Sequence, residues 1–159
     1  MNEALNAGRV IMPPASVAST ATATLNFDTL GYDYLVADFT YGTQSTTDAA
    51  LTVLKWAEGD TTSSYADIVA FTGGTATSTS VGYVIPAVTV SGLGGGIQFQ
   101  MDLRKRKRYL KLSFTPGTAV VAGCVVTMTR PEISKLTAAS KSVSNISATN
   151  AAVNLLVNG

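Results

Sequence analysis

The chain has 159 residues and a mass of 16.4 kDa, a size that suits one compact domain. Charged residues make up only 13% and the formal net charge is +1, so no overall field directs the chain toward nucleic acid or an anionic membrane. Histidine is absent and Cys124 is the single cysteine, which excludes histidine-based catalysis, His or multi-Cys metal sites and a disulfide within the chain. We therefore expect no enzymatic activity and no cofactor.

The ends and the uncharged stretches give no sign of a membrane or secretory segment. The first nine residues include an acidic side chain and lack a continuous apolar run, so we expect no signal peptide. No charge occurs between Asp67 and Asp102, but Pro86 and the glycine cluster at 92–96 interrupt that stretch. A membrane-spanning helix needs about 20 predominantly apolar residues, and we expect none.

Short apolar runs rich in β-branched residues recur between Gly, Pro, Asn and Asp, a pattern typical of strands and turns. No segment has a sustained helical period. The runs predicted as strands before the basic segment of the chain are, in order, residues 35–41, 51–56, 67–71, 82–85 and 87–90, the last two divided by Pro86.

The clearest alternation of apolar and polar residues lies on either side of residues 104–108. Apolar side chains occupy the odd positions from Ile97 to Leu103 and the even positions from Leu110 to Phe114. Since a slip of one residue moves every side chain to the other face, this change predicts a turn or bulge within 104–108. A turn at Pro116 and a long strand over 119–128 follow.

These strands predict an all-β fold, either a jelly-roll-like β-sandwich or a small barrel. We assign the β domain to residues 28–131, with an N-terminal arm over 1–27 and a C-terminal arm over 132–159. Both arms are rich in small and hydroxyl residues and bury too little apolar surface to become ordered alone. The C-terminal arm is either a flexible tail or a segment that becomes ordered on a neighbouring subunit, where Leu155, Leu156 and Val157 enter a groove or a sheet edge.

The basic segment is the strongest charge feature of the chain. Arg104, Lys105, Arg106, Lys107 and Arg108, with Lys111 nearby, hold six of the eleven basic residues. The run could be a nucleic-acid patch or a localisation signal. Because it lies between two apolar strands, we predict the exposed bend of a hairpin, in which alternate residues point to opposite sides. Ten acidic residues are enough to pair with it, and no aromatic platform for stacking bases accompanies it. We favour a solvated or subunit-interface role over nucleic-acid binding.

Two further residue types have a structural interpretation. Asp28, Asp33 and Asp38 recur at intervals of five, and we interpret them as turn and surface residues rather than paired catalytic carboxylates. Cys124 lies in a strand of small residues and is expected to be a buried apolar side chain rather than a reactive thiol.

The core of the chain, from about Leu30 to Arg130, also carries a resemblance to a known family. The segments concerned are YLVADF at 34–39, LKWAEGD at 54–60, YADI at 65–68, FTGGT at 71–75, VIPA at 84–87 and DLRKRKRYLKL at 102–112. With them the chain resembles the head decoration (cement) proteins of tailed bacteriophages. Members of that family have a jelly-roll-like β fold and bind as trimers to an assembled capsid built from a single major capsid protein. The segment from Glu132 onward departs from the family pattern.

The resemblance implies a homotrimer that binds the phage major capsid protein and stabilises the assembled head. It implies a location on the virion surface after assembly in the host cytoplasm, and no catalytic residues. The basic run 104–108 and residues 155–157 are then candidate subunit or capsid contacts. One alternative is a tail-fibre or receptor-binding β-sandwich, which would expose an aromatic cluster drawn from Trp56, Tyr32 or Tyr41. Another is a virion protein that binds nucleic acid through the basic run.

Overall fold

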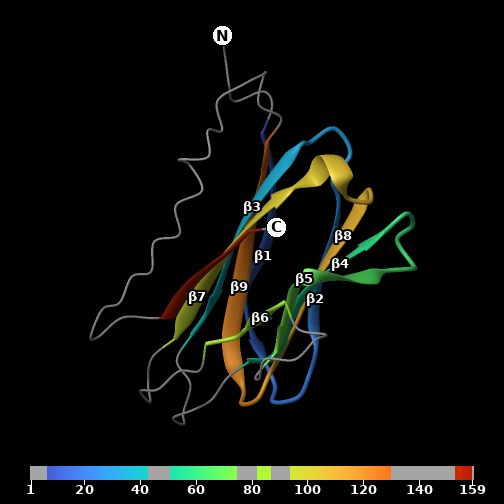
Figure 1. Cartoon of the computed structure of the whole chain (residues 1–159). Coiled ribbons are helices and arrows are strands. Elements are labelled where there is room, and N and C mark those ends of the chain that lie inside the picture. The colour runs from blue at the N-terminus through green and yellow to red at the C-terminus, as the bar shows by residue number, and fades with distance from the viewer. Residues whose placement is uncertain (1–6, 43–50, 75–81, 87–93, 130–152, 159) are drawn as a thin grey trace.

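The computed structural model describes residues 7–42, 51–74, 82–86, 94–129 and 153–158. These residues form two β-sheets packed face to face, with one short 3-10 turn (Figure 1). The all-β prediction is confirmed. The elements are β1 (Ala7–Val17), β2 (Ala23–Asp28), β3 (Tyr34–Tyr41), β4 (Leu51–Gly59), β5 (Ala66–Gly74), β6 (Tyr83–Val84), β7 (Gly95–Asp102), η2 (Leu103–Lys105), β8 (Tyr109–Pro116), β9 (Val120–Thr129) and β10 (Val153–Asn158).

The strand pairs are nested along the chain, as in one long hairpin that has been rolled up. β1 pairs with β9, β2 with β8, β3 with β7 and β4 with β5, all antiparallel. Two further antiparallel pairs, β3 with β9 and β4 with β8, join these ribbons into two sheets. The resulting orders are β1-β9-β3-β7-β10 in the first sheet and β2-β8-β4-β5-β6 in the second. Without β6 and β10 this is the eight-stranded arrangement of a jelly roll, so the sandwich alternative of the sequence prediction holds.

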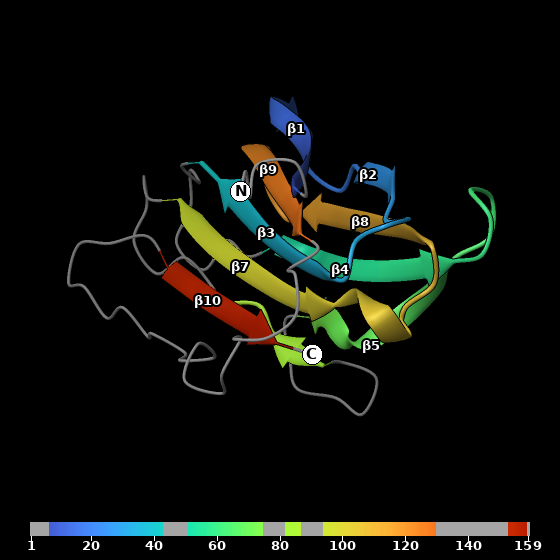
Figure 2. The ribbon, with the colours of Figure 1, turned by 90° about the horizontal axis from the view of Figure 1, so that it is seen from above.

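The core fills the space between the sheets seen edge-on in Figure 2. Alternate residues of each strand point inward, as the period of a strand requires. Trp56, fully buried, packs edge-on against Phe27 at 6.0 Å and Phe99 at 5.7 Å between ring centroids. Phe99 also contacts the rings of Phe71 and Tyr83 at 6.2 and 6.0 Å. This aromatic chain joins β2, β4, β7, β5 and β6 into one core.

The structure corrects the predicted N-terminal arm of residues 1–27. Residues 7–17 form β1 and residues 23–28 form β2, at one edge of each sheet. The β1 register shifts between Met12 and Ala15, where Pro13 and Pro14 lie. Proline has no N–H to donate and is therefore confined to edge strands or bulges. The Pro-Pro pair thus marks an edge strand with a bulge rather than the end of the sheet.

The strands predicted over 35–41, 51–56, 67–71, 97–103 and 119–128 correspond to β3, β4, β5, β7 and β9. β6 occupies only two residues of the predicted 82–85 run, and residues 87–90 lie outside the described part of the chain. The predicted hairpin at the basic segment is wrong, because β7 lies in the first sheet and β8 in the second. The buried apolar residues change from odd positions in β7 to even positions in β8 because the chain passes from the first sheet to the second. The core lies on the opposite side of the chain after that passage.

Candidate functional site

The basic turn, which we define as residues 104–108, connects the two sheets at one end of the sandwich. It begins with η2, where the Asp102 carboxylate accepts the backbone N–H of Arg104 at 3.0 Å and caps the turn. Leu103 is buried, and its backbone N–H donates to the carbonyl of Asp33 at 2.8 Å. The basic turn is therefore anchored by a buried side chain and by backbone bonds at its start.

Acidic residues from three other places in the sequence gather around the basic turn. Arg108 donates to both carboxylate oxygens of Asp28, at 2.6 to 3.0 Å. Lys107 pairs with Asp60 at 2.5 Å. These contacts tie the end of β2 and the loop after β4 to the start of β8.

Glu58, at the end of β4, makes the most enclosed of these pairs. Its carboxylate accepts the backbone N–H of Lys107 at 3.2 Å and lies 3.9 Å from the Arg106 guanidinium. The side chains of Glu58 and Arg106 are only 20% and 24% exposed. Arg106 is thus less exposed than the paired cations Arg104, Lys107 and Arg108 of the basic turn.

The ion pairs also shift the acidity of the groups involved. The hydrogen bond from Arg108 is the main cause that holds the pKa of Asp28 below its usual value. A hydrogen bond from Arg104 has the same effect on the pKa of Asp102, and the two groups lie 2.5 Å apart. The pKa of Lys107 is raised by its hydrogen bond to Asp60. Each shift favours the charged state of both partners.

Tyrosine rings shield three of the cations at this end of the molecule. The Arg104 guanidinium lies 5.0 Å from the centre of the Tyr34 ring. Two further pairs of this kind are Arg108 with Tyr109 at 5.0 Å and Lys111 with Tyr65 at 4.6 Å. A cation over an aromatic face is attracted to it, so the rings help to hold these side chains in place.

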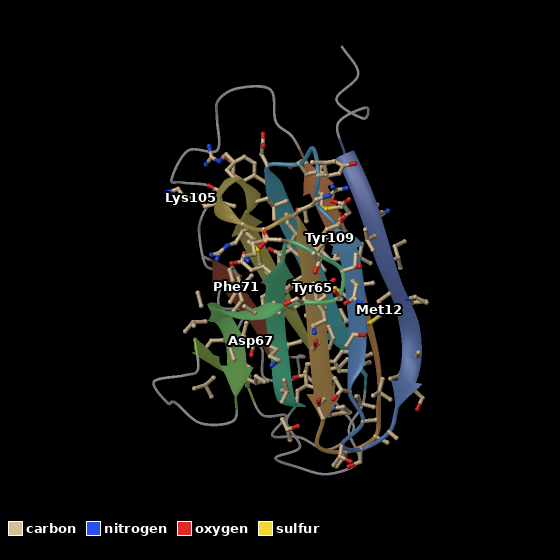
Figure 3. All side chains as sticks on the ribbon, turned by 90° about the vertical axis from the view of Figure 1, so that its right-hand side faces the viewer. Met12, Tyr65, Asp67, Phe71, Lys105 and Tyr109 are labelled. Atoms are coloured by element: carbon tan, nitrogen blue, oxygen red, sulfur yellow. The ribbon has the colours of Figure 1, made fainter. Side chains whose placement is uncertain are left out.

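Lys105 is the exception within the basic turn. It is exposed at the end of the sandwich (Figure 3) and makes no ion pair within 4 Å to a carboxylate of the described residues. The five cations of the basic turn therefore do not form one patch. Four are paired with acids, and Lys105 remains available to a partner.

The second group of candidate residues, 155–157, lies in β10 at the edge of the first sheet. β10 runs parallel to β7, with Leu155 opposite Ile97 and Val157 opposite Phe99. The sequence left open a flexible tail or an arm ordered on a neighbouring subunit, whereas the structure places these residues along a sheet edge of the same chain. The rest of the predicted C-terminal arm, residues 132–152, lies outside the described part of the chain.

Two rows on the outer face of the first sheet contain few charges, a feature that the sequence analysis did not identify. On the first sheet, one row across the strands consists of Ile11, Val125, Asp38 and Gln98. The next row consists of Arg9, Thr127, Val36 and Gln100. Asp38 and Arg9 are thus the charged members of these two rows. On the second sheet, Lys55 of β4 pairs with Asp67 of β5 at 2.7 Å. The alternation within each strand contained this signal, but only the strand order reveals which residues share a face.

The three aromatic residues that a receptor-binding module would have to expose lie in the core or pack against it. Trp56 is fully buried and Tyr41 is 4% exposed, while Tyr32 is half-buried against the core.

Cys124 is buried as predicted, and burial is the main cause that raises the pKa of its thiol to about 12. Within the described residues, His, Cys, Asp and Glu side chains form no group of three that could hold a metal ion.

Sequence comparison with known proteins assigns this chain to no family. No protein-family model matches the chain, and a search of curated proteins finds no match. None of the described segments is a helix long and apolar enough to cross a membrane.

Proposed function

We propose that this chain is a structural virion protein, a homotrimeric cement or decoration protein that binds the major capsid protein of an assembled phage head and stabilises the shell. It performs no catalysis and resides on the head surface after assembly in the host cytoplasm. The observation that carries the proposal is the jelly-roll order of the strands, since this is the fold that the resemblance to decoration proteins implies.

The outer face of the first sheet supports a role in protein contacts. Its two described rows contain mainly Val, Ile, Thr and Gln side chains. Protein interfaces are depleted of charged residues at their centres. A sheet face with few charges can be buried against another subunit at little cost in desolvation.

The paired state of the basic turn argues against the nucleic-acid alternative. Binding through phosphates requires several cations that can leave their present partners and contact the backbone of the nucleic acid. Here the Arg106 side chain is only 24% exposed, and Arg104, Lys107 and Arg108 each pair with a carboxylate. We assign the basic turn mainly to holding the two sheets together, with Lys105 as its contact to an acidic partner surface.

Stabilisation of a shell needs no chemistry beyond binding. A protein that binds the assembled capsid but not its separate subunits shifts the equilibrium toward assembly. Three identical binding faces on one trimer add avidity to a modest individual contact.

The first test is the copy number of this chain relative to the major capsid protein in purified particles, measured by quantitative mass spectrometry. A cement protein is present in hundreds of copies, in a ratio compatible with trimers across the shell. A handful of copies would instead support the tail-fibre or receptor-binding alternative, and absence from the particle would exclude both.

A matched pair of variants tests the face of the first sheet. Thr40 in β3 and Thr24 in β2 are both exposed strand residues, on the outer faces of the first and second sheets. We expect Thr40→Lys to abolish trimer formation or binding to assembled shells, and Thr24→Lys to leave both unchanged. Light scattering gives the oligomeric state, and co-sedimentation with shells gives the binding. Full binding by Thr40→Lys would remove this face from the proposal.

The exposed cation of the basic turn has its own test. Lys105→Glu is expected to weaken binding to shells, because it reverses the charge available to an acidic surface. The double variant Thr24→Glu with Asn26→Glu, at two exposed positions of β2 on the second sheet, lowers the net charge by the same two units and is the control for a change of net charge alone. Equal effects of the two variants would mean that Lys105 makes no specific contact.

A further inference from the structure

Without β10, the two outer edges of the first sheet are β1 and β7, and they are protected in different ways. The edge at β1 carries Pro13 and Pro14 and a shift of register, two devices that prevent another strand from pairing. The opposite edge, β7, has neither. Its register with β3 is continuous from Gly95 to Asp102, it contains no proline, and its one charge lies at its last residue. A long, regular and uncharged edge of this kind is a template for a further strand.

β10 covers that edge. It pairs in parallel with β7 from Val153 opposite Gly95 to Asn158 opposite Gln100. Its extensive contacts within the described chain are with β7 alone. The ladder between β7 and β10 is therefore a self-contained unit, which can form without any change in the other strand pairs.

The connection to β10 is long for the distance it covers. β9 ends at Thr129, beside Tyr34 and so at the Asp102 end of β7, whereas β10 begins at the Gly95 end. At about 3.3 Å per residue and about 4.8 Å between strands, the two points are about 28 Å apart. The 23 residues 130–152 can reach about 75 Å when extended. Links longer than about 12–15 residues are uncommon in compact domains and usually have a function.

We propose that β10 is an exchanged strand, which pairs with β7 of a second copy of this chain in the assembled protein. Every copy carries the same β7 edge, so the ladder of the single chain can form between copies with the same register and the same hydrogen bonds. Exchange of an identical element is a low-cost way to join subunits. The link has the length to reach a neighbouring subunit, and a closed ring of exchanged strands leaves no β7 edge uncovered. The inference rests on the self-association in the proposed function, not on binding to a capsid.

Engineered cysteines at one position of the ladder test the exchange. Gln98 in β7 lies opposite Leu156 in β10, and neighbouring strands are close enough for a disulfide. One chain carries Gln98→Cys and a second, with a different tag, carries Leu156→Cys. Both carry Cys124→Ala, so that only the engineered thiols react. The two chains are co-expressed, purified through both tags, oxidised mildly and analysed by mass spectrometry without reduction.

Exchange predicts a disulfide between the two chains in most of the doubly tagged assemblies. It also predicts covalently linked oligomers from a chain that carries Gln98→Cys and Leu156→Cys together. A control pair, Thr24→Cys with Leu156→Cys, places one thiol on the other sheet and should not link. Disulfides found only within single chains would overturn the exchange.

The outcome for the proposed function is measured separately on the same samples. Trimers that bind shells but link only within each copy would refute the exchange and leave the cement function standing. Linked copies that do not bind shells would support the exchange and refute the cement function. A chain that remains monomeric at all concentrations would refute both.

Discussion

Phe99 provides a quantitative test of how the two sheets are held together. Its side chain is fully buried, and its ring contacts those of Trp56, Phe71 and Tyr83 at 5.7 to 6.2 Å. Phe99→Ala should lower the free energy of unfolding by about 4 kcal/mol, since buried Phe-to-Ala changes cost about 3–5 kcal/mol. Phe99→Leu retains most of the volume but loses three ring contacts, each worth at least about 0.5 kcal/mol. We expect a loss of about 2 kcal/mol.

The measurement is urea unfolding at a fixed protein concentration, because self-association would add to the apparent stability. Trp56 is the one tryptophan of the chain and lies against Phe99, so its fluorescence reports on this part of the core. Thr24→Ala, an exposed change in the edge strand β2 of the second sheet, is the control and should alter the free energy by less than about 0.5 kcal/mol. Equal losses for the Leu and Ala variants, or losses near that of the control, would refute the aromatic packing described above.

Three further predictions concern single residues. A Cβ at Gly95 would overlap the ring of Tyr41, so Gly95→Ala should lower the Tm by several degrees, as for a loss of about 1–3 kcal/mol from overpacking; an unchanged Tm by calorimetry would contradict the close approach. Because burial raises the pKa of Cys124 to about 12, a disulfide reagent at pH 8 should modify it only after unfolding in urea, and rapid reaction of the folded protein would show that the thiol is accessible. The pKa of Asp28 is lowered in the folded state, so its contribution to stability is present above the ordinary carboxylate pKa of about 4 and is lost as the pH falls through the folded value. Asp28→Asn should therefore lower the Tm at pH 7 but not near pH 2, and equal losses at both pH values would contradict the ion pair with Arg108.

The central strands could be predicted from the sequence because their local pattern and their place in the fold agree. In β7 the apolar residues at odd positions from Ile97 to Met101 are all buried. β3 shows the same agreement between Leu35 and Tyr41. Strands with one face on the core carry an alternation that requires no knowledge of their neighbours.

The first two strands could not be predicted in this way. β1 contains Pro13 and Pro14, and β2 contains Thr24 and Asn26, residues that are common in irregular segments. Both strands owe their conformation to partners far along the chain, β9 and β8. A local pattern cannot contain that information.

The basic turn, too, could be predicted from the sequence only in part. The sequence located the basic turn and indicated that ten acids could neutralise it. It could not show which acids do so, because Asp28, Glu58 and Asp60 come from other strands and loops. It also could not separate a hairpin from a passage between sheets, since either can move the apolar residues from odd to even positions.

The nested strand order has a consequence for biosynthesis. Ala7 of β1 pairs with Thr129 of β9, so the two partners are separated by most of the β domain. At about 5–20 residues per second, a ribosome takes about 6–24 s to add the intervening chain. Until then β1 has no partner, and the pairing of distant segments makes folding slow. Pro13 and Pro14 therefore protect β1 when it is most vulnerable, on the nascent chain, where many copies emerge close together from one message.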